Sequence, residues 1–235
     1  MGALEGSVAA VSGGMGGVGG GIAKAFVREG ARVVVSGLDA RRLAELGGNG
    51  RLAFYPGIPS ERVTVEGLVD FAAERFGRLD VLVLSPAGPN GAASVAELDD
   101  DRWQQVLDLN LNHVFWGIRR ALHHMLPRGE GRIIVTSALE GKLPRAGASG
   151  YVAAQHAVNG LVKSVAHEVS PKGIAVNAIL PGVLDGADEQ LLERSKLGRP
   201  NTVEEVASVA VLLATPSITS ISGCLFPVDG GTMPY

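Results

Sequence analysis

The stretch Val11-Ser-Gly-Gly-Met-Gly-Gly-Val-Gly-Gly-Gly21 decides how the rest of the chain is interpreted. It follows the short apolar run Val8–Val11 and precedes Ile22–Arg28, in which apolar residues recur at helical spacing. A strand, a glycine loop and a helix in this order let backbone N–H groups and a helix N-terminus face a phosphate. Glycine is needed in such a loop because a Cβ atom would hold the phosphate away. The stretch therefore predicts a dinucleotide phosphate site, with a ligand-free glycine turn as the alternative.

Two glycine spacings fit this stretch. The pattern GxGxxG from Gly14 to Gly19 is the general dinucleotide fingerprint, with Asp39 twenty positions beyond it as a ribose ligand. The pattern GxxxGxG, preceded by Ser12, is the second. The motifs in the remainder of the chain belong with the second pattern. Its loop glycines are Gly13, Gly17 and Gly19.

The composition is that of a globular protein with a large core. Of the 235 residues, 46% are apolar and 19% are charged, and the formal net charge is −3. We expect a single domain over residues 1–235, because this length suits one large α/β domain and no repeat or low-complexity linker divides the chain. Lysine and arginine form no large cluster, so nucleic-acid binding is not expected.

The sequence also gives expectations for location and metal binding. It has neither an N-terminal signal region nor an apolar run of about 18 residues, so we expect a soluble, cytoplasmic protein that does not enter a membrane. The single cysteine, Cys224, fits a reducing compartment and is interpreted as a buried core thiol. The five histidines are not spaced as metal ligands, so no metal site is expected.

Apolar segments of strand length alternate along the chain with longer segments of helical period. Strands are predicted at Ser7–Val11, Arg32–Ser36, Leu52–Tyr55, Val81–Leu84, Arg132–Thr136, Ala175–Ile179 and Cys224–Val228. Helices are predicted at Gly20–Arg28, Ala40–Leu46, Val63–Phe76, Asp100–Met125, Tyr151–Val169 and Val203–Leu213. A capping box at Thr202–Glu205 and breakers at Ser170–Gly173 mark two helix ends. The alternation predicts a doubly wound α/β Rossmann fold, with a seven-stranded parallel sheet and helices on both faces.

The order of the motifs resembles the short-chain dehydrogenase/reductase (SDR) family, in the single-domain branch that includes 3-oxoacyl-acyl-carrier-protein reductases. The resemblance runs from Leu4 to Met233. It covers the family's TGxxxGIG loop, the lead into its fourth strand, its active-site asparagine, the start of its fifth strand, its NAxxPG turn and its C-terminal VDGG. The matching segments are Ser12–Gly19, Phe76–Val83, Asp108–Leu111, Gly131–Ile134, Asn177–Gly182 and Val228–Gly231.

The resemblance implies a catalytic site of four side chains. A tyrosine exchanges a proton with the substrate oxygen, a serine binds that oxygen, a lysine holds the nicotinamide ribose and lowers the phenol pKa, and an asparagine keeps a relay water. Tyr151 matches the tyrosine and Asn110 the asparagine. The serine and lysine positions instead hold Ala138 and Gln155, and the neighbouring Ser137 is expected to point to the opposite face. Without a nearby ammonium, the pKa of Tyr151 is expected near its ordinary value of about 10.

The family's cofactor is NAD or NADP, and the resemblance implies where it would bind. The implied cofactor-binding residues are Ser12, Gly13, Met15, Gly17, Val18, Gly19, Asp39, Ala87, Gly88, Gln155, Pro181 and Gly182. Residues 36–38 offer neither the acid that reads an NAD ribose nor the arginine that reads an NADP phosphate, which leaves Asp39 or Arg41 as substitutes. The family's NNAG segment is altered to Leu84–Gly88, and its proline removes a backbone donor. NAD, NADP and no cofactor therefore remain alternatives.

Two classes of function follow. The first is an NAD(P)(H)-dependent oxidoreductase acting on a carbonyl or alcohol, with impaired activity because of Ala138 and Gln155. The second is an SDR-fold protein without this chemistry: a partner subunit of an active relative, a small-molecule binder, or an enzyme of non-redox chemistry. His156 is not expected to act as a base, because it lies about 100° round the helix from Tyr151. The resemblance implies a small-molecule substrate or ligand and a homotetramer or homodimer, with a heteromer as the alternative.

Overall fold

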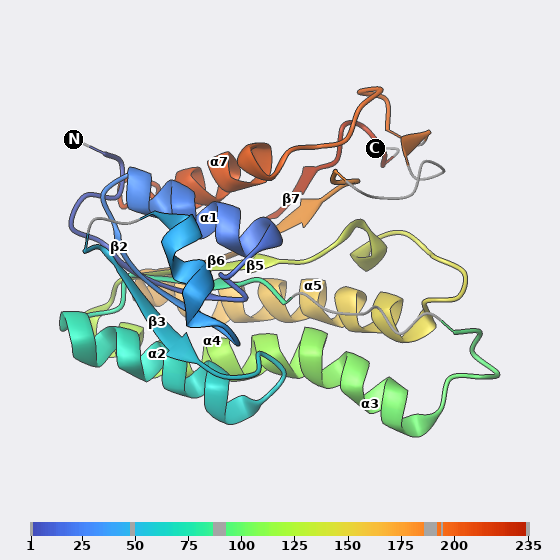
Figure 1. Cartoon of the computed structure of the whole chain (residues 1–235), viewed down its shortest axis with the longest axis horizontal. Coiled ribbons are helices and arrows are strands. Elements are labelled where there is room, and N and C mark those ends of the chain that lie inside the picture. The colour runs from blue at the N-terminus through green and yellow to red at the C-terminus, as the bar shows by residue number, and fades with distance from the viewer. Residues whose placement is uncertain (1, 48–49, 87–92, 186–191, 194, 234–235) are drawn as a thin grey trace.

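The computed structural model of the chain describes residues 2–47, 50–86, 93–185, 192–193 and 195–233 (Figure 1). Its strands form one sheet in the order β3-β2-β1-β4-β5-β6-β7, and all neighbouring strands are parallel. The strands are β1 (Val8–Ser12), β2 (Arg32–Gly37), β3 (Leu52–Pro56), β4 (Val81–Leu84), β5 (Gly131–Thr136), β6 (Ile174–Pro181) and β7 (Leu225–Val228). The predicted doubly wound Rossmann fold is confirmed.

Helices lie on both faces of the sheet (Figure 1). The α-helices are α1 (Gly17–Arg28), α2 (Arg62–Phe76), α3 (Asp100–Leu107), α4 (His113–Met125), α5 (Ser149–Val169) and α7 (Val203–Ala214). The short 3₁₀ helices are η1 (Ala40–Leu46), η3 (Leu126–Arg128), η4 (Leu139–Gly141) and η5 (Ser170–Lys172), and η2 (Asp108–Asn112) is a π-helical turn. The predicted capping box is present, with Thr202 and Glu205 each bonding the other's backbone at the start of α7.

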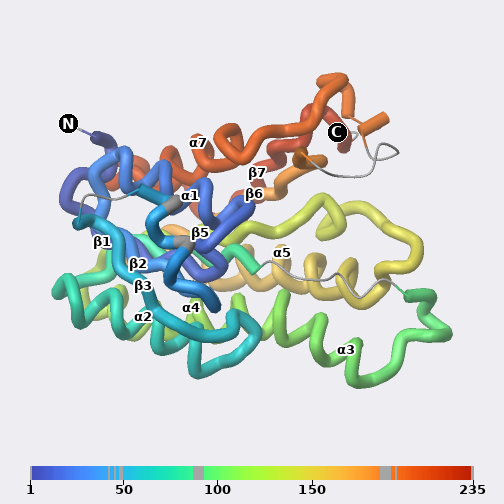
Figure 2. Tube along the Cα trace, viewed as in Figure 1, coloured from blue at the N-terminus to red at the C-terminus, as the bar shows by residue number. Residues whose placement is uncertain are grey.

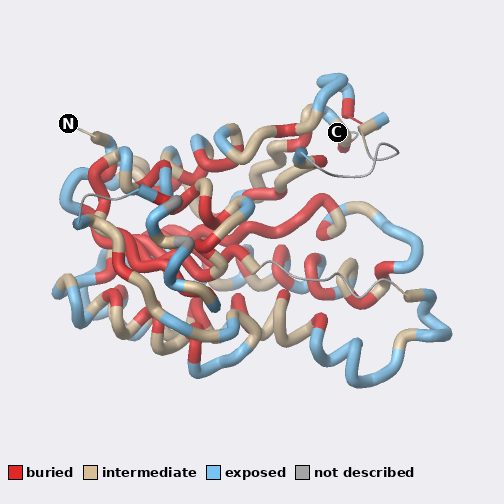
Figure 3. The backbone as a smooth tube through the Cα atoms, viewed as in Figure 1, coloured by how far each residue is buried: buried red, intermediate tan, exposed pale blue. Residues whose placement is uncertain are grey.

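The two faces of the sheet carry separate apolar cores. On one face, α1 and α7 pack against each other and bury Ile22, Phe26 and Leu213. On the other face, α2, α4 and α5 bury side chains such as Leu68 and Ile118. Successive strand residues point to opposite faces, so continuous apolar strands are needed to fill both cores. Figure 3 shows the resulting band of buried residues through the middle of the molecule. Cys224 lies outside it: the expectation of a buried core thiol is wrong, because this cysteine is exposed just before β7.

Two predicted helices differ from what periodicity indicated. Residues Ala40–Leu46 form a 3₁₀ helix, which begins where Asp39 accepts a hydrogen bond from the backbone N–H of Arg41 over 3.0 Å. The predicted helix Asp100–Met125 is interrupted by the π turn η2 between α3 and α4. A π turn inserts one residue without changing the apolar pattern on either side, so periodicity does not reveal it.

The strands end together at one edge of the sheet, where parallel α/β folds bind their ligands. There Ser12 stands in register with Leu84, and Gly37 with Pro56. Figure 2 follows the backbone through the loops at this edge. Within the part of the chain that is described, no helix is long and apolar enough to cross a membrane, and no group of three or more His, Cys, Asp or Glu side chains could hold a metal ion.

Candidate active site

The glycine loop lies between the end of β1 and the start of α1. Gly13 and Gly17 both have positive φ, at 71° and 51°, a conformation that side chains disfavour. A Cβ atom on Gly13 would collide with the carbonyl oxygen of Ser85, and one on Gly19 would collide with the carbonyl of Gly13. Two of the three glycines therefore serve close packing of the loop on β4 and α1.

Gly17 has a different environment, at the first residue of α1. Apart from its chain neighbours and the backbone of α1, no described atom lies within 4 Å of the position that its Cβ would take. The preceding residue, Gly16, is extended and supplies no side-chain cap, so the first N–H groups of α1 are available to an anion. This part of the loop fits a pyrophosphate, while Val18 packs against the core on the α1 side of the sheet.

Met15, in the loop between β1 and α1, lies against the last residue of β2. Its side chain lies directly over Gly37, where an added Cβ would collide with Met15 Cγ and stand 3.0 Å from Met15 Cβ. Only 9% of Met15 is exposed, and it belongs to the core on the α1 side of the sheet together with Leu46 of η1. The place where the family reads the ribose or its phosphate therefore holds an apolar side chain in this chain.

The two substitutes considered for reading the ribose are engaged with each other. Asp39 accepts from the side chain of Arg41 over 2.8 Å as well as from its backbone. The Arg41 side chain is 91% exposed, so this is a surface ion pair. Ala87 and Gly88, the other residues expected at the cofactor floor, lie outside the described residues.

Ser12 ends β1 beside the altered segment that begins at the end of β4. Its hydroxyl is completely buried and has no hydrogen-bond partner among the described residues. The residue in register with it on β4 is Leu84, at the start of the segment that replaces the family's NNAG. The apolar side chain at that position cannot bond the hydroxyl.

A chain of neutral side chains crosses the position of the family's lysine. Asn110 donates to the carbonyl of Val106 over 2.9 Å, and Gln155 donates to Oδ1 of Asn110 over 3.2 Å. At the other end, Asn159 donates to the carbonyl of Gly141 over 3.0 Å. These side chains are all buried.

Ser137 joins the two ends of this series of hydrogen-bonded side chains. Its hydroxyl lies 3.0 Å from Oε1 of Gln155 and 2.8 Å from Oδ1 of Asn159. Sequence reasoning assigned no role to Ser137 or Asn159. The signal that was available is the spacing of Gln155 and Asn159, which lie four and eight residues after Tyr151 and share its helix face.

Tyr151 has an environment that opposes ionisation. Burial, and next the Glu140 carboxylate, raise the pKa of Tyr151 to about 12, while Arg145 and a hydrogen bond with Gln155 lower it by less. The expectation of an ordinary pKa is therefore wrong, because it considered only the missing lysine and neither the burial of the phenol nor the Glu140 carboxylate that η4 places beside it. Ala138, at the serine position, is buried and has no side-chain donor.

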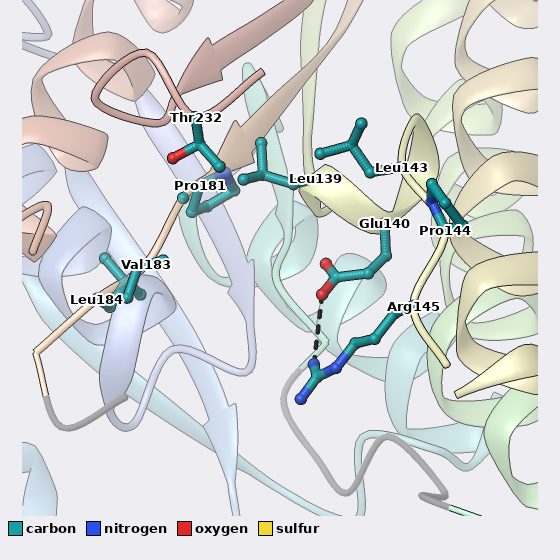
Figure 4. A pocket seen from close by; sticks show the side chains of 10 residues that line it. Leu139, Glu140, Leu143, Pro144, Arg145, Pro181, Val183, Leu184 and Thr232 are labelled. Atoms are coloured by element: carbon teal, nitrogen blue, oxygen red, sulfur yellow. Dashed lines mark hydrogen bonds and ion pairs between the residues drawn. The ribbon is translucent and has the colours of Figure 1, made fainter. Parts of the chain in front are cut away.

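A pocket of about 210 Å³ lies beside these residues (Figure 4). Its lining residues are Leu139, Glu140, Leu143, Pro144, Arg145, Pro181, Gly182, Val183, Leu184 and Thr232. Glu140 and Arg145 form an ion pair over 3.3 Å on one side, and Val183 and Leu184 lie on the opposite side (Figure 4). The pocket is thus apolar apart from this pair, the backbone and the Thr232 hydroxyl.

Two histidines behave differently from each other. His156 is exposed and its Nδ1 lies 2.9 Å from the carbonyl of Val152, so it stands apart from the chain of buried side chains. His113 is completely buried, with Nδ1 2.7 Å from the carbonyl of Pro59 and no partner for Nε2 among the described residues. Burial lowers the pKa of His113 to about 4, so its imidazole is neutral at physiological pH.

These residues fit only part of a dinucleotide. The open side of Gly17 suits a pyrophosphate. Met15 takes the space over Gly37 at the adenosine end, and at the nicotinamide end the neutral amide of Gln155, which donates to Asn110, replaces the family's ammonium. The residues present therefore do not fit NAD or NADP held in the family's manner.

Comparison with known proteins gives consistent matches over nearly the whole chain. The family model described as short chain dehydrogenase matches residues 7–195. A 3-alpha-(or 20-beta)-hydroxysteroid dehydrogenase of Mycobacterium tuberculosis is 37% identical over 239 residues, which cover 99% of this chain and 91% of that protein. The 3beta-hydroxysteroid dehydrogenase 2 of Eggerthella lenta is 33% identical over 251 residues, covering 99% and 96%. A D-beta-hydroxybutyrate dehydrogenase of Cupriavidus necator is 30% identical over 254 residues, covering 97% and 98%.

Proposed function

Since this chain belongs to the short-chain dehydrogenase family, we propose that it is an oxidoreductase of that family whose standard NAD(P)(H)-dependent hydride transfer is impaired. The observation that carries the proposal is the position of Gln155. Its amide nitrogen donates to Asn110 and its oxygen faces the Ser137 hydroxyl, so this position holds a neutral, hydrogen-bonded amide and supplies no positive charge.

The proton-transfer step is the part of the reaction most affected. A general acid or base works best when its pKa lies near the operating pH. With a pKa of about 12, Tyr151 is a phenolate in roughly one molecule in 10⁵ at pH 7. Oxidation of an alcohol, which needs the phenolate as base, is then disfavoured. Reduction of a ketone is also slowed, because the phenol is a weaker acid.

The substrate oxygen also lacks its usual donor. Ala138 stands where the family has a serine, and removal of one such donor typically lowers turnover by about 10²-fold to 10³-fold. The effects at positions 138, 151 and 155 need not add, since the groups act as one unit. Together they support a protein that keeps the family's fold and a small-molecule pocket but turns over slowly.

A second candidate is a protein without catalytic function, either a small-molecule binder or a partner subunit of an active relative. The apolar pocket with its Glu140–Arg145 pair favours binding of a small, mainly apolar molecule. Non-redox chemistry at the same pocket is the further alternative. We take the protein to be a single domain in the cytoplasm. Its exposed Trp103 and Phe115, at 38% and 42%, could form part of the subunit interface of a homodimer, a homotetramer or a heteromer.

The test is a steady-state assay of the wild-type protein in both directions. NADH and NADPH are offered with ketones, and NAD and NADP with 3-hydroxysteroids and 3-hydroxybutyrate, the substrate classes in the names of the relatives. We expect turnover below about 10⁻² s⁻¹, roughly a thousandfold under that of a typical enzyme. Turnover near that of a typical enzyme with any of these substrates, abolished in Tyr151→Phe, would overturn the proposal.

A further inference from the structure

We propose that Met15 closes the adenosine end of the nucleotide site, so that the wild-type chain rejects the adenosine half of a dinucleotide. The inference goes beyond the proposed function, which concerns proton transfer at Tyr151. It concerns the opposite end of the site and a different class of interaction, the exclusion of a sugar by an apolar side chain.

Met15 packs directly against Gly37. Gly37 is the last residue of β2, and its missing Cβ is what makes room for the Met15 side chain. Met15 is 9% exposed and packs into the same core as Leu46. A side chain held on both sides in this way cannot swing out at low cost, because leaving the core would expose its apolar surface to water.

The end of β2 also lacks the carboxylate that commonly binds a ribose. A ribose is commonly bound through its hydroxyls by a carboxylate at the end of the second strand. Here that position is Gly37, and the nearby Asp39 carboxylate already accepts from both the backbone and the side chain of Arg41. Ser36, the other polar residue at the strand end, is completely buried.

The residues that follow the ends of β2 and β3 are apolar and exposed. Leu38 and Ile58 follow the ends of the neighbouring strands β2 and β3, and they are 76% and 44% exposed. Apolar side chains in this position suit the faces of a planar base. On the other side, Gly17 leaves the phosphate position free. The obstruction is therefore confined to one side chain, and its removal should restore binding.

The experiment is calorimetric titration with ADP-ribose, which contains the adenosine and pyrophosphate but no nicotinamide. Its second ribose would lie beside Gln155 and Tyr151, which are the same in every variant compared, so a difference between variants reports on the adenosine end. The proteins are wild type, Met15→Ala, Met15→Leu as a control that keeps the volume, and Leu213→Ala as a control for loss of core packing. Leu213 is 2% exposed in the same core but belongs to α7. Thermal melting checks that each variant is folded.

We expect no binding of ADP-ribose, NADH or NADPH to the wild type up to about 1 mM. We expect Met15→Ala to bind ADP-ribose at least tenfold more tightly than the wild type and both controls. Micromolar binding to the wild type, or binding by Met15→Ala no tighter than by Leu213→Ala, would overturn the inference. If the wild type binds NADH but turns over no substrate, this inference fails while the proposed function stands. If the wild type turns over substrate at an ordinary rate, the proposed function fails as well.

Discussion

The side-chain amide of Gln155 donates to Oδ1 of Asn110 over 3.2 Å, so the lysine position of the family is occupied by a neutral group that is already bonded. The amides of Asn110 and Asn159 are oriented by the backbone carbonyls of Val106 and Gly141. Both ends of the chain therefore present an oxygen to the single hydroxyl of Ser137. Since a serine hydroxyl carries one proton, it can donate to only one of these two oxygens at a time.

Removal of the Ser137 hydroxyl should destabilise the fold. Ser137→Ala leaves the amide oxygens of both Gln155 and Asn159 buried without this donor. We expect the free energy of unfolding to fall by about 1–3 kcal/mol, measured by urea denaturation. The control is Ser208→Ala, at an exposed serine that bonds only the Glu204 carbonyl. A loss at position 137 as small as at position 208 would contradict the role of the hydroxyl.

An ammonium at position 155 should lower the pKa of Tyr151. Gln155→Lys places a positive charge one helical turn from the phenol, and a nearby opposite charge lowers an acid's pKa by about 1–3 units. The pKa is measured by NMR of tyrosine labelled at Cζ, and Gln155→Met serves as the uncharged control. An equal pKa in the two variants would show that charge at this position does not reach Tyr151.

Neutralising Glu140 should lower the same pKa by a separate route. The Glu140 carboxylate is the second largest cause of the raised pKa, after burial. In Glu140→Gln the repulsion is removed while Arg145 stays, so ionisation of the phenol becomes easier. The control is Glu97→Gln, at a carboxylate that accepts a hydrogen bond from Ser94, and it should leave the pKa of Tyr151 unchanged. A higher pKa of Tyr151 in Glu140→Gln than in the wild type would contradict this account.

The Met15–Gly37 contact should appear as a coupling energy. Gly37→Ala introduces a Cβ that collides with the Met15 side chain, so we expect it to cost about 1–3 kcal/mol of stability. In the Met15→Ala background most of this cost should disappear. A double-mutant cycle measured by urea denaturation gives the coupling directly. Equal costs of Gly37→Ala in both backgrounds would exclude the contact.

His113 should make stability depend on pH. Its pKa in the folded protein is about 4, below the ordinary 6.5, so the unfolded chain takes up the proton first as the pH falls. The stability that neutral His113 contributes is present above about pH 6.5 and is lost as the pH falls towards 4. Between pH 7.5 and 4.5, we expect the free energy of unfolding of His113→Gln to fall by about 2–3 kcal/mol less than that of the wild type. The exposed His123→Gln should behave as wild type.

The fold was predictable because both faces of the sheet are buried. Runs such as Val33–Val35 must be apolar at every position, and this is visible without a structure. The π turn at Asp108–Asn112 was not predictable, since the apolar pattern continues across it. Helix ends marked by side chains, as at Thr202, were predicted to within one residue.

The site was predictable only where residues are related by helical spacing. Tyr151 and Gln155 lie on one helix, so their shared face follows from the sequence. Glu140 reaches Tyr151 from the short helix η4. Met15, in the loop after β1, meets Gly37 at the end of β2, because these two strands are neighbours in the sheet. Such contacts depend on how loops at the strand ends fold together, which residue spacing alone does not specify.

The most direct test of impaired hydride transfer is the pKa of Tyr151 in the wild-type protein, because it needs no substrate or cofactor. The chain has three tyrosines, so ¹³C NMR with Cζ-labelled tyrosine gives three signals and Tyr151→Phe assigns the one of interest. The account predicts that this signal titrates near pH 12, above the ordinary value of 10.0. A midpoint at or below 10.0 would contradict it, because the phenol would then retain the ordinary or lowered pKa on which the family's proton transfer depends.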